Sequence, residues 1–131
     1  KDYRFEINKK LIQYGGYDVK GGYESLIKFI NFDNPPSAVL VTNYYMTIGA
    51  ITAINELDIT LPDDLSFIGY DNLEMTKIIK PPLSIVEQPM DKMGKNVAEV
   101  LIKRLRGDKE NFPNTVRLKT HFNKGKTILE L

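Results

Sequence analysis

The hydrophobic positions of the chain alternate between short continuous runs and stripes with a helical spacing. Two continuous apolar runs, at 38–41 and 65–69, predict strands. The run at 38–41 is also β-branched, which predicts a strand buried on both faces of a sheet. Apolar residues recur at helical spacing in three other segments, at 23–30, 46–57 and 91–106. Strands and helices that alternate through short loops predict an α/β fold, with a parallel sheet flanked by helices and right-handed crossovers.

Shorter apolar runs predict four further strands. LIQY at 11–14 is followed by two glycines, and the run at 84–86 comes after a pair of prolines. TVRL at 115–118 and TILEL at 127–131 are also predicted as strands. Gly, Pro and Asp punctuate the chain between these runs, so the predicted elements are joined without a long linker or a repeat.

The composition is that of an ordinary folded chain. The 131 residues are 42% hydrophobic and 27% charged, which excludes a disordered or collagen-like protein and fits one domain or part of a larger one. Cysteine is absent, so thiol catalysis, thiolate metal sites and disulfides are excluded, and a reducing cytosol is the expected compartment. No apolar run approaches the roughly 18 residues of a membrane span, and the first ten residues do not resemble a signal peptide.

The charge is balanced overall but uneven along the chain. The net charge is +1, with −4 over residues 1–87 and +5 over residues 88–131. The overall balance argues against attraction of the whole surface to nucleic acid or anionic lipid. The basic part is either a nucleic-acid face or a solvated basic helix, and the second interpretation is favoured.

Polar and aromatic residues stand where the predicted strands end. In open parallel sheets, ligands bind outside the carboxyl ends of the strands. Tyr17 follows the first predicted strand, Asn43 and Tyr44 follow the second, and Asp71 and Asn72 follow the third. A carboxylate accepts hydroxyl hydrogen bonds, an amide donates and accepts them, and a tyrosine ring offers a flat apolar face, so these groups suit a polyhydroxylated ring. The alternative is that the Asn and Asp residues are helix N-caps and the tyrosines are packing residues.

Arrangements for catalysis are weak by comparison. His121 is the single histidine, and no G-x-S-x-G turn accompanies it. No G-x-G-x-x-G or P-loop spacing offers a phosphate cradle. Asp63 and Asp64 follow a proline and precede a strand, which is typical of turn residues rather than of a metal site. We therefore expect a binding protein with no cofactor, no metal and no enzymatic activity.

Several motifs occur in one order and carry a family resemblance. The run PSAVLVTNYYMTIGAITAINELDITLPDDLSFIGYDN, followed by PPLSIVEQPMDKMGKNVAEVLIKRL, resembles the C-terminal part of the lactose-repressor family of bacterial transcription regulators. The resemblance covers about residues 15–131. It implies a fold like that of type I periplasmic binding proteins, with two α/β subdomains around a ligand cleft. DNA binding would belong to a helix-turn-helix headpiece that is not among these residues.

The resemblance also assigns roles to single residues. It implies that Asn43 and Asp71 contact the effector and that Tyr17 packs against it. Most relatives have Asp immediately after that Asn, whereas this chain has Tyr44, which would reshape the pocket. The arginine that clamps the ligand in the family is expected upstream of residue 1.

By the same analogy the chain divides into three parts. Residues 1–88 would belong to the C-terminal subdomain, residues 89–119 would supply a helix and a strand to the other subdomain, and residues 120–131 would return. Leu101 and Leu105 would then lack their packing partners. We expect that segment to be poorly ordered, collapsed on the rest, or paired with another chain.

Family dimers form through the C-terminal subdomain, and the resemblance assigns Ile48, Ile78 and Ile79 to that interface. The alternative is that these residues are ordinary core. The expected function is to bind a sugar-like effector and to dimerise in a cytoplasmic repressor whose binding to operator DNA responds to the effector. Alternatives are a periplasmic sugar-binding protein of a transporter, an α/β enzyme, and a regulator that responds mainly to a protein corepressor.

Overall fold

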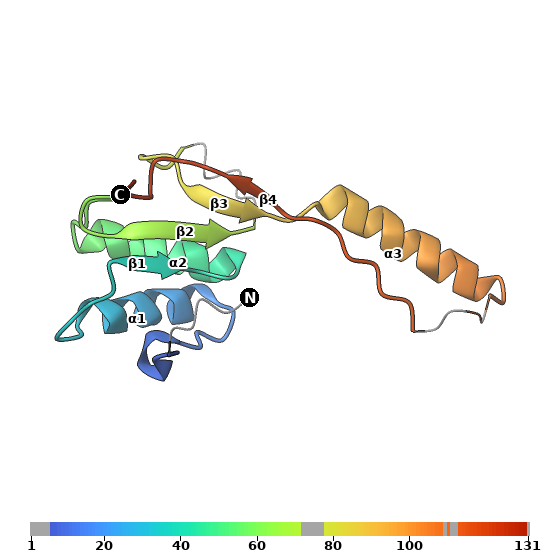
Figure 1. Cartoon of the computed structure of the whole chain (residues 1–131), viewed down its shortest axis with the longest axis horizontal. Helices are drawn as coiled ribbons and strands as arrows, with labels where there is room; N and C mark the ends of the chain where they lie inside the picture. The colour runs from blue at the N-terminus through green and yellow to red at the C-terminus, as the bar shows by residue number, and fades with distance from the viewer. Residues whose placement is uncertain (1–5, 72–77, 109, 111–112, 131) are drawn as a thin grey trace.

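The computed structural model describes residues 6–71, 78–108, 110 and 113–130. In this part of the chain, four strands form one sheet in the order β1-β2-β3-β4 (Figure 1). The first three strands are parallel, and β4 pairs antiparallel with β3. The strands are β1 Ala38–Leu40, β2 Ser66–Tyr70, β3 Ser84–Glu87 and β4 His121–Asn123.

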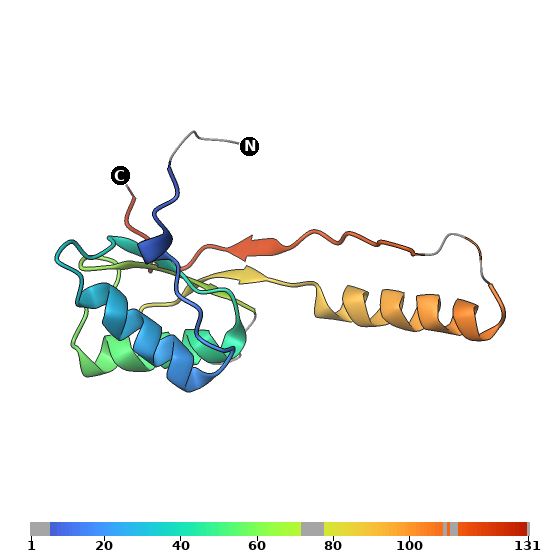
Figure 2. The ribbon, with the colours of Figure 1, turned by 90° about the horizontal axis from the view of Figure 1, so that it is seen from below.

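The helices follow the predicted stripes closely. A short 3₁₀ turn, η1, spans Lys9–Leu11, and the three α-helices are α1 Val19–Ile30, α2 Tyr44–Glu56 and α3 Met90–Leu105. Figure 2 shows α1 and α2 on the same side of the sheet. The predicted α/β class, with a mainly parallel sheet flanked by helices, is confirmed.

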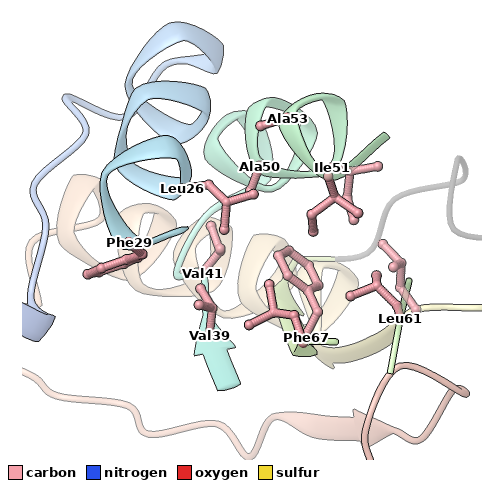
Figure 3. Packing of buried hydrophobic residues seen from close by; sticks show 12 residues of the cluster. Leu26, Phe29, Val39, Val41, Ala50, Ile51, Ala53, Leu61 and Phe67 are labelled. Atoms are coloured by element: carbon pink, nitrogen blue, oxygen red, sulfur yellow. The ribbon is translucent and has the colours of Figure 1, made fainter. Parts of the chain in front are cut away.

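The core lies between the sheet and these two helices. Phe67 is fully buried at its centre and packs beneath α2 (Figure 3). Burial alternates along β1 and β2, so Val39 and Phe67 face the helices whereas Leu40 is 58% exposed. The prediction that the strand at 38–41 is buried on both faces is therefore wrong, because in the described structure helices cover one face. The buried cluster consists of Leu26, Phe29, Val39, Val41, Ala50, Ile51, Ala53, Ile54, Leu61, Leu65, Phe67 and Leu83.

Two glycines allow α1 and α2 to approach closely. A Cβ at Gly22 would lie 2.2 Å from the Met46 carbonyl oxygen, and one at Gly49 would lie 1.9 Å from the Val19 carbonyl oxygen. The Tyr23 hydroxyl joins the same helices by donating to Glu56 Oε2 at 2.6 Å. That hydrogen bond is the main reason why the pKa of Tyr23 is raised above 10.0.

Residues near the C-terminus are hydrogen bonded to the sheet through a buried polar cluster. The Thr127 hydroxyl donates to the Phe67 carbonyl oxygen at 2.7 Å and accepts from the Ser84 backbone N–H at 2.8 Å. The Phe67 N–H donates to the Thr127 carbonyl oxygen at 2.6 Å. Ser84 Oγ in turn accepts from the Gly125 N–H at 3.1 Å. The pairing of β2 with β3 begins only at Ile68, so Thr127 supplies the hydrogen-bond partners for the backbone of the preceding residue, Phe67.

Three of the shorter predicted strands are wrong. Residues 12–15 follow η1 without regular structure and form no backbone hydrogen bond to a strand in the described structure. The segments 115–118 and 127–130 also have no strand, although Thr127 is hydrogen bonded to β2. The strand β4 at His121–Asn123 was not predicted, since its pairing with β3 and not an apolar pattern defines it.

Helix α3 stands away from the sheet. It has no buried residue, and Figures 1 and 2 show it pointing away beside the returning chain. Leu101 and Leu105 are exposed, so of the three alternatives for this segment, collapse onto the rest of the chain is wrong. The division at residues 88 and 119 stays a prediction. Within the described residues, no helix is both long and apolar enough to cross a membrane.

Candidate functional site

Asn43 is the residue that caps the N-terminus of α2. Its Oδ1 accepts from the Met46 backbone N–H at 3.0 Å, so the N-cap interpretation is correct. Its Nδ2 is buried and has no hydrogen-bond partner among the described residues. A buried donor without a partner is unfavourable, and groups of this kind occur where a ligand or water completes the bonding. Capping and ligand binding are therefore compatible, because they use different atoms of the same side chain.

Asp71 directly follows β2 and is partly buried. Its backbone N–H donates to the Val86 carbonyl oxygen at 2.9 Å, and its Oδ1 accepts from Gln88 Nε2 at 2.5 Å. Its φ is 72°, in the left-handed region that residues with a Cβ rarely adopt. The neighbouring strand thus holds the residue in an uncommon backbone conformation at the carboxyl end of β2.

Tyr17 lies in the turn before α1. Its φ is 62°, and Gly16 beside it has φ 65°, so two successive residues are left-handed. The side chain is 76% exposed, which leaves its ring free to contact a ligand and contradicts the alternative that it is a packing residue. Asp18 then caps α1 by accepting from the Gly21 N–H at 2.6 Å.

Tyr44 is the first residue of α2 and is half-buried. Its ring meets that of Tyr45 edge-to-face, with centroids 5.1 Å apart. This contact is the kind that a packing role predicts.

A pocket of about 470 Å³ runs along the free edge of β1. It is mostly apolar, and its lining includes Tyr17, Thr42, Asn43 and Met46. The pocket exists because residues 12–15 pass alongside β1 without forming a backbone hydrogen bond to it in the described structure.

The pocket brings together two of the four predicted ligand-binding residues, Tyr17 and Asn43. Asp71 and Tyr44 do not line it. The register of β1 and β2 relates Asp71 to Asn43. Leu40 of β1 pairs with Ile68 of β2, Asn43 follows Leu40 by three positions, and Asp71 follows Ile68 by three positions. Both therefore lie at the carboxyl ends of adjacent parallel strands.

The three predicted interface residues have different environments. Ile78 is 75% exposed, Ile79 packs against the core cluster, and Ile48 is partly buried on α2. The core alternative thus holds for Ile79, and the interface prediction suits Ile78.

Other candidate groups are placed as turn or surface residues. Asp64 Oδ2 accepts from the Thr60 N–H at 2.8 Å, which confirms its turn role. His121 is exposed on β4. Among the described residues, no group of three or more His, Asp or Glu side chains is placed to hold a metal ion. Asn72 lies outside the described residues.

Sequence reasoning missed Gln88 as part of the site. The contact between Gln88 and Asp71 joins residues seventeen positions apart. A local pattern does not signal such a contact.

Comparison with known proteins places the chain among bacterial regulators. The family model of the periplasmic binding protein-like domain matches residues 5–128. The HTH-type transcriptional repressor PurR of Histophilus somni is 37% identical over 99 residues, which are 76% of this chain and 30% of that repressor. The repressor PurR of Vibrio vulnificus is 32% identical over 111 residues, 85% of this chain and 33% of that protein. The chain thus spans about a third of the length of these relatives.

Solved structures give the same result for the fold. A LacI family transcriptional regulator from Enterococcus faecium with bound ribose superposes with a TM-score of 0.75 at 28% identity, covering 88% of this chain and 42% of that one. The transcriptional regulator CelR in complex with cellobiose superposes with a TM-score of 0.83 at 24% identity, covering 93% of this chain and 37% of that one.

Proposed function

The chain belongs to the periplasmic binding protein-like family, as part of the effector-binding core of a LacI-family transcription regulator, and we propose that it binds a small sugar-like effector. The relatives are transcriptional repressors, which does not fit the alternative of a transport protein. We further propose that the chain acts by binding and not by catalysis.

The observation that carries the proposal is the buried Nδ2 of Asn43. An unpaired buried donor costs about 1–3 kcal/mol, and a ligand hydroxyl that accepts from it would remove that cost. Asp71, at the end of the adjacent strand, offers a carboxylate oxygen to a second hydroxyl. A donor and an acceptor on neighbouring strand ends match neighbouring hydroxyls of a sugar ring.

Apolar surface beside these groups supports a ring-shaped ligand. Sugars present C–H faces as well as hydroxyls, and the exposed Tyr17 ring is suited to such a face. The pocket that contains Tyr17 and Asn43 is within the size range of small-molecule sites. Tyr44, at the position where the family resemblance leads us to expect Asp, would border the ligand at the start of α2 and make this part of the site less polar.

The proposed mechanism is a shift between conformations. An effector that binds one arrangement of the two subdomains better than the other changes operator affinity, and about 1–3 kcal/mol of coupling changes it 5- to 150-fold. In this scheme residues 89–119 belong to the second subdomain, the protein is a cytoplasmic homodimer, and a headpiece outside this chain contacts DNA. The exposed Ile78 and the partly buried Ile48 would lie in the dimer interface.

The test is a sugar titration with site variants. D-ribose and cellobiose are titrated calorimetrically into the longer regulator that we propose contains this chain, and operator binding is measured with and without each sugar. Asn43→Ala and Asp71→Ala should each weaken sugar binding at least about tenfold, since each removes a hydrogen bond to a buried or charged group. Operator binding without sugar should not change.

Asn55→Ala is the matched control, because Asn55 is exposed near the end of the same helix that Asn43 begins. If Asn43→Ala and Asp71→Ala respond to sugar as the wild type does, the site is assigned wrongly. If neither sugar changes operator binding but a protein that binds the regulator does, the result would instead support the corepressor alternative.

A further inference from the structure

Two chain segments connect α3 to the sheet. One leaves β3 and reaches α3 within two residues, and the other returns from α3 to β4. Glu87 and His121 form the outermost registered pair between β3 and β4. We call the two segments 84–89 and 119–123 the connecting ribbon, and Figure 1 shows them side by side where the chain departs toward α3.

Hydrogen bonds join the two strands of the ribbon, so we expect the strands to move together. Asn123 Nδ2 on β4 donates to Glu87 Oε2 on β3 at 2.5 Å. The backbone pairing of Ile85, Val86 and Glu87 with β4 supports the same unit. A change in the direction of this ribbon would therefore carry α3 with it.

One side chain of the ribbon reaches the ligand-binding rim. Gln88 lies one residue beyond the last β3–β4 pair, is partly buried, and donates from Nε2 to Asp71 Oδ1 at 2.5 Å. A hydrogen bond to a charged carboxylate is stronger than a neutral one. The Asp71 backbone is bonded to Val86 on the same strand. Residues of the ribbon thus fix both the backbone and the carboxylate of Asp71.

The left-handed backbone of Asp71 makes this support necessary. Conformations of that kind persist in residues with a Cβ when the surroundings hold them in place. Without the bond from Gln88, the carboxylate can rotate about its side-chain torsions, and the ribbon loses a contact with the end of β2.

The geometry points to Gln88 as a positioning residue that couples the sugar-binding rim to the direction of the connecting ribbon. This inference rests on the proposed function, because it assigns Asp71 to the ligand. A ligand that requires one orientation of the Asp71 carboxylate also favours one position of Gln88, and hence one direction of the ribbon. By reciprocity, fixing the ribbon favours the ligand to the same extent.

The experiment measures the ribbon's direction with two spin labels. The chain has no cysteine, so cysteines introduced at the exposed positions Asn55 on α2 and Glu99 on α3 are the unique labelling sites. Pulsed dipolar spectroscopy of the 131-residue chain then gives the distribution of distances between α2 and α3. Gln88→Leu removes the donor at similar size, and Gln88→Glu keeps the shape but replaces the donor with a second carboxylate.

Gln13→Leu is the matched control. The Gln13 side chain donates to the Lys10 carbonyl oxygen and accepts from Lys28 Nζ, and none of its hydrogen bonds in the described structure reaches the ribbon. Without sugar, both Gln88 variants should broaden the distance distribution, whereas Gln13→Leu should leave it unchanged. A distribution unchanged in both Gln88 variants overturns the inference, and Gln88→Glu keeps the test informative if Gln88→Leu does not fold.

Sugar separates this inference from the proposed function. When D-ribose or cellobiose binds, the wild-type distribution should narrow. Gln88→Leu should bind about 2- to 12-fold more weakly, the range expected for one hydrogen bond, and its distribution should stay broad. Narrowing in Gln88→Leu at saturating sugar overturns the coupling. If the longer regulator binds neither sugar but the Gln88 variants of the 131-residue chain still broaden the distance distribution, the proposed function fails while the positioning role of Gln88 is supported.

Discussion

Replacing Thr127 by Val tests how the end of the chain is fastened to the sheet. Thr127 is fully buried, and its hydroxyl both accepts from the Ser84 N–H and donates to the Phe67 carbonyl oxygen. Valine has nearly the same shape but neither donates nor accepts. The substitution therefore leaves two buried backbone groups without these partners while the apolar packing stays almost unchanged.

The expected loss follows from those two groups. Each buried polar group left unpaired costs about 1–3 kcal/mol, so Thr127→Val should lower the free energy of unfolding by about 2–6 kcal/mol. A domain is usually stable by about 5–15 kcal/mol, so this loss is a large fraction of the total. Thr127→Ser keeps the hydroxyl and removes one methyl, which should cost about 1 kcal/mol.

Urea denaturation followed by circular dichroism measures both losses. Thr52→Val is the control, because the Thr52 hydroxyl donates to the Ile48 carbonyl oxygen on the exposed surface of α2, and its removal should change stability by less than about 0.5 kcal/mol. If Thr127→Val is as stable as Thr52→Val, the buried hydroxyl does not fasten the returning chain and the reasoning is refuted.

Three other substitutions test the packing, the turn and the surface charge. Gly49→Ala places a Cβ 1.9 Å from a backbone oxygen of α1 and should prevent stable folding. Gly94→Ala, with nothing within 4 Å of the added Cβ, should raise the free energy of unfolding measured in urea by about 0.5–1 kcal/mol. Tyr17→Gly should stabilise the chain by about 1 kcal/mol by relieving a left-handed backbone, yet weaken sugar binding in calorimetry because the ring is lost. The hydrogen bond from Lys124 lowers the pKa of Glu130 below 4.5. The bond therefore stabilises the folded chain above pH 4.5, and this stabilisation is lost as the pH falls through the lowered pKa. An NMR titration of Glu130 in Lys124→Met should show its pKa return toward 4.5, and an unchanged titration would contradict the assignment.

The sequence predicted the elements whose pattern comes from their own burial. The stripes of α1 and α2 and the apolar runs of β1 and β2 reflect a common core, so their positions were correct within a few residues. The run at 11–14 was misjudged because its apolar residues belong to the wall of a pocket and not to a strand ladder. β4 was missed because HFN carries no alternating apolar pattern and depends on β3 for its pairing.

The sequence could predict those residues of the candidate site that follow directly after a strand. Asn43 and Asp71 could be named because each follows a buried run, and the register of β1 and β2 brings both to one rim. The unpaired Nδ2 of Asn43 and the bond between Gln88 and Asp71 could not be named, since both depend on how side chains pack in three dimensions. The position of a residue thus followed from the pattern, whereas its bonding state did not.

Helix α3 shows what a periodic pattern records. Its stripe of Met93, Val97, Leu101 and Leu105 predicted the helix, yet these side chains are 37%, 67%, 56% and 79% exposed in the described structure. A helix of this length gains little from propensity alone, and each fully buried side chain of this kind contributes about 1.5–3 kcal/mol. The stripe therefore suits a surface other than β1–β4, because those strands leave it uncovered. That is the arrangement that a division of the chain at residues 88 and 119 predicts, with α3 packing in a second subdomain and the connecting ribbon joining the two.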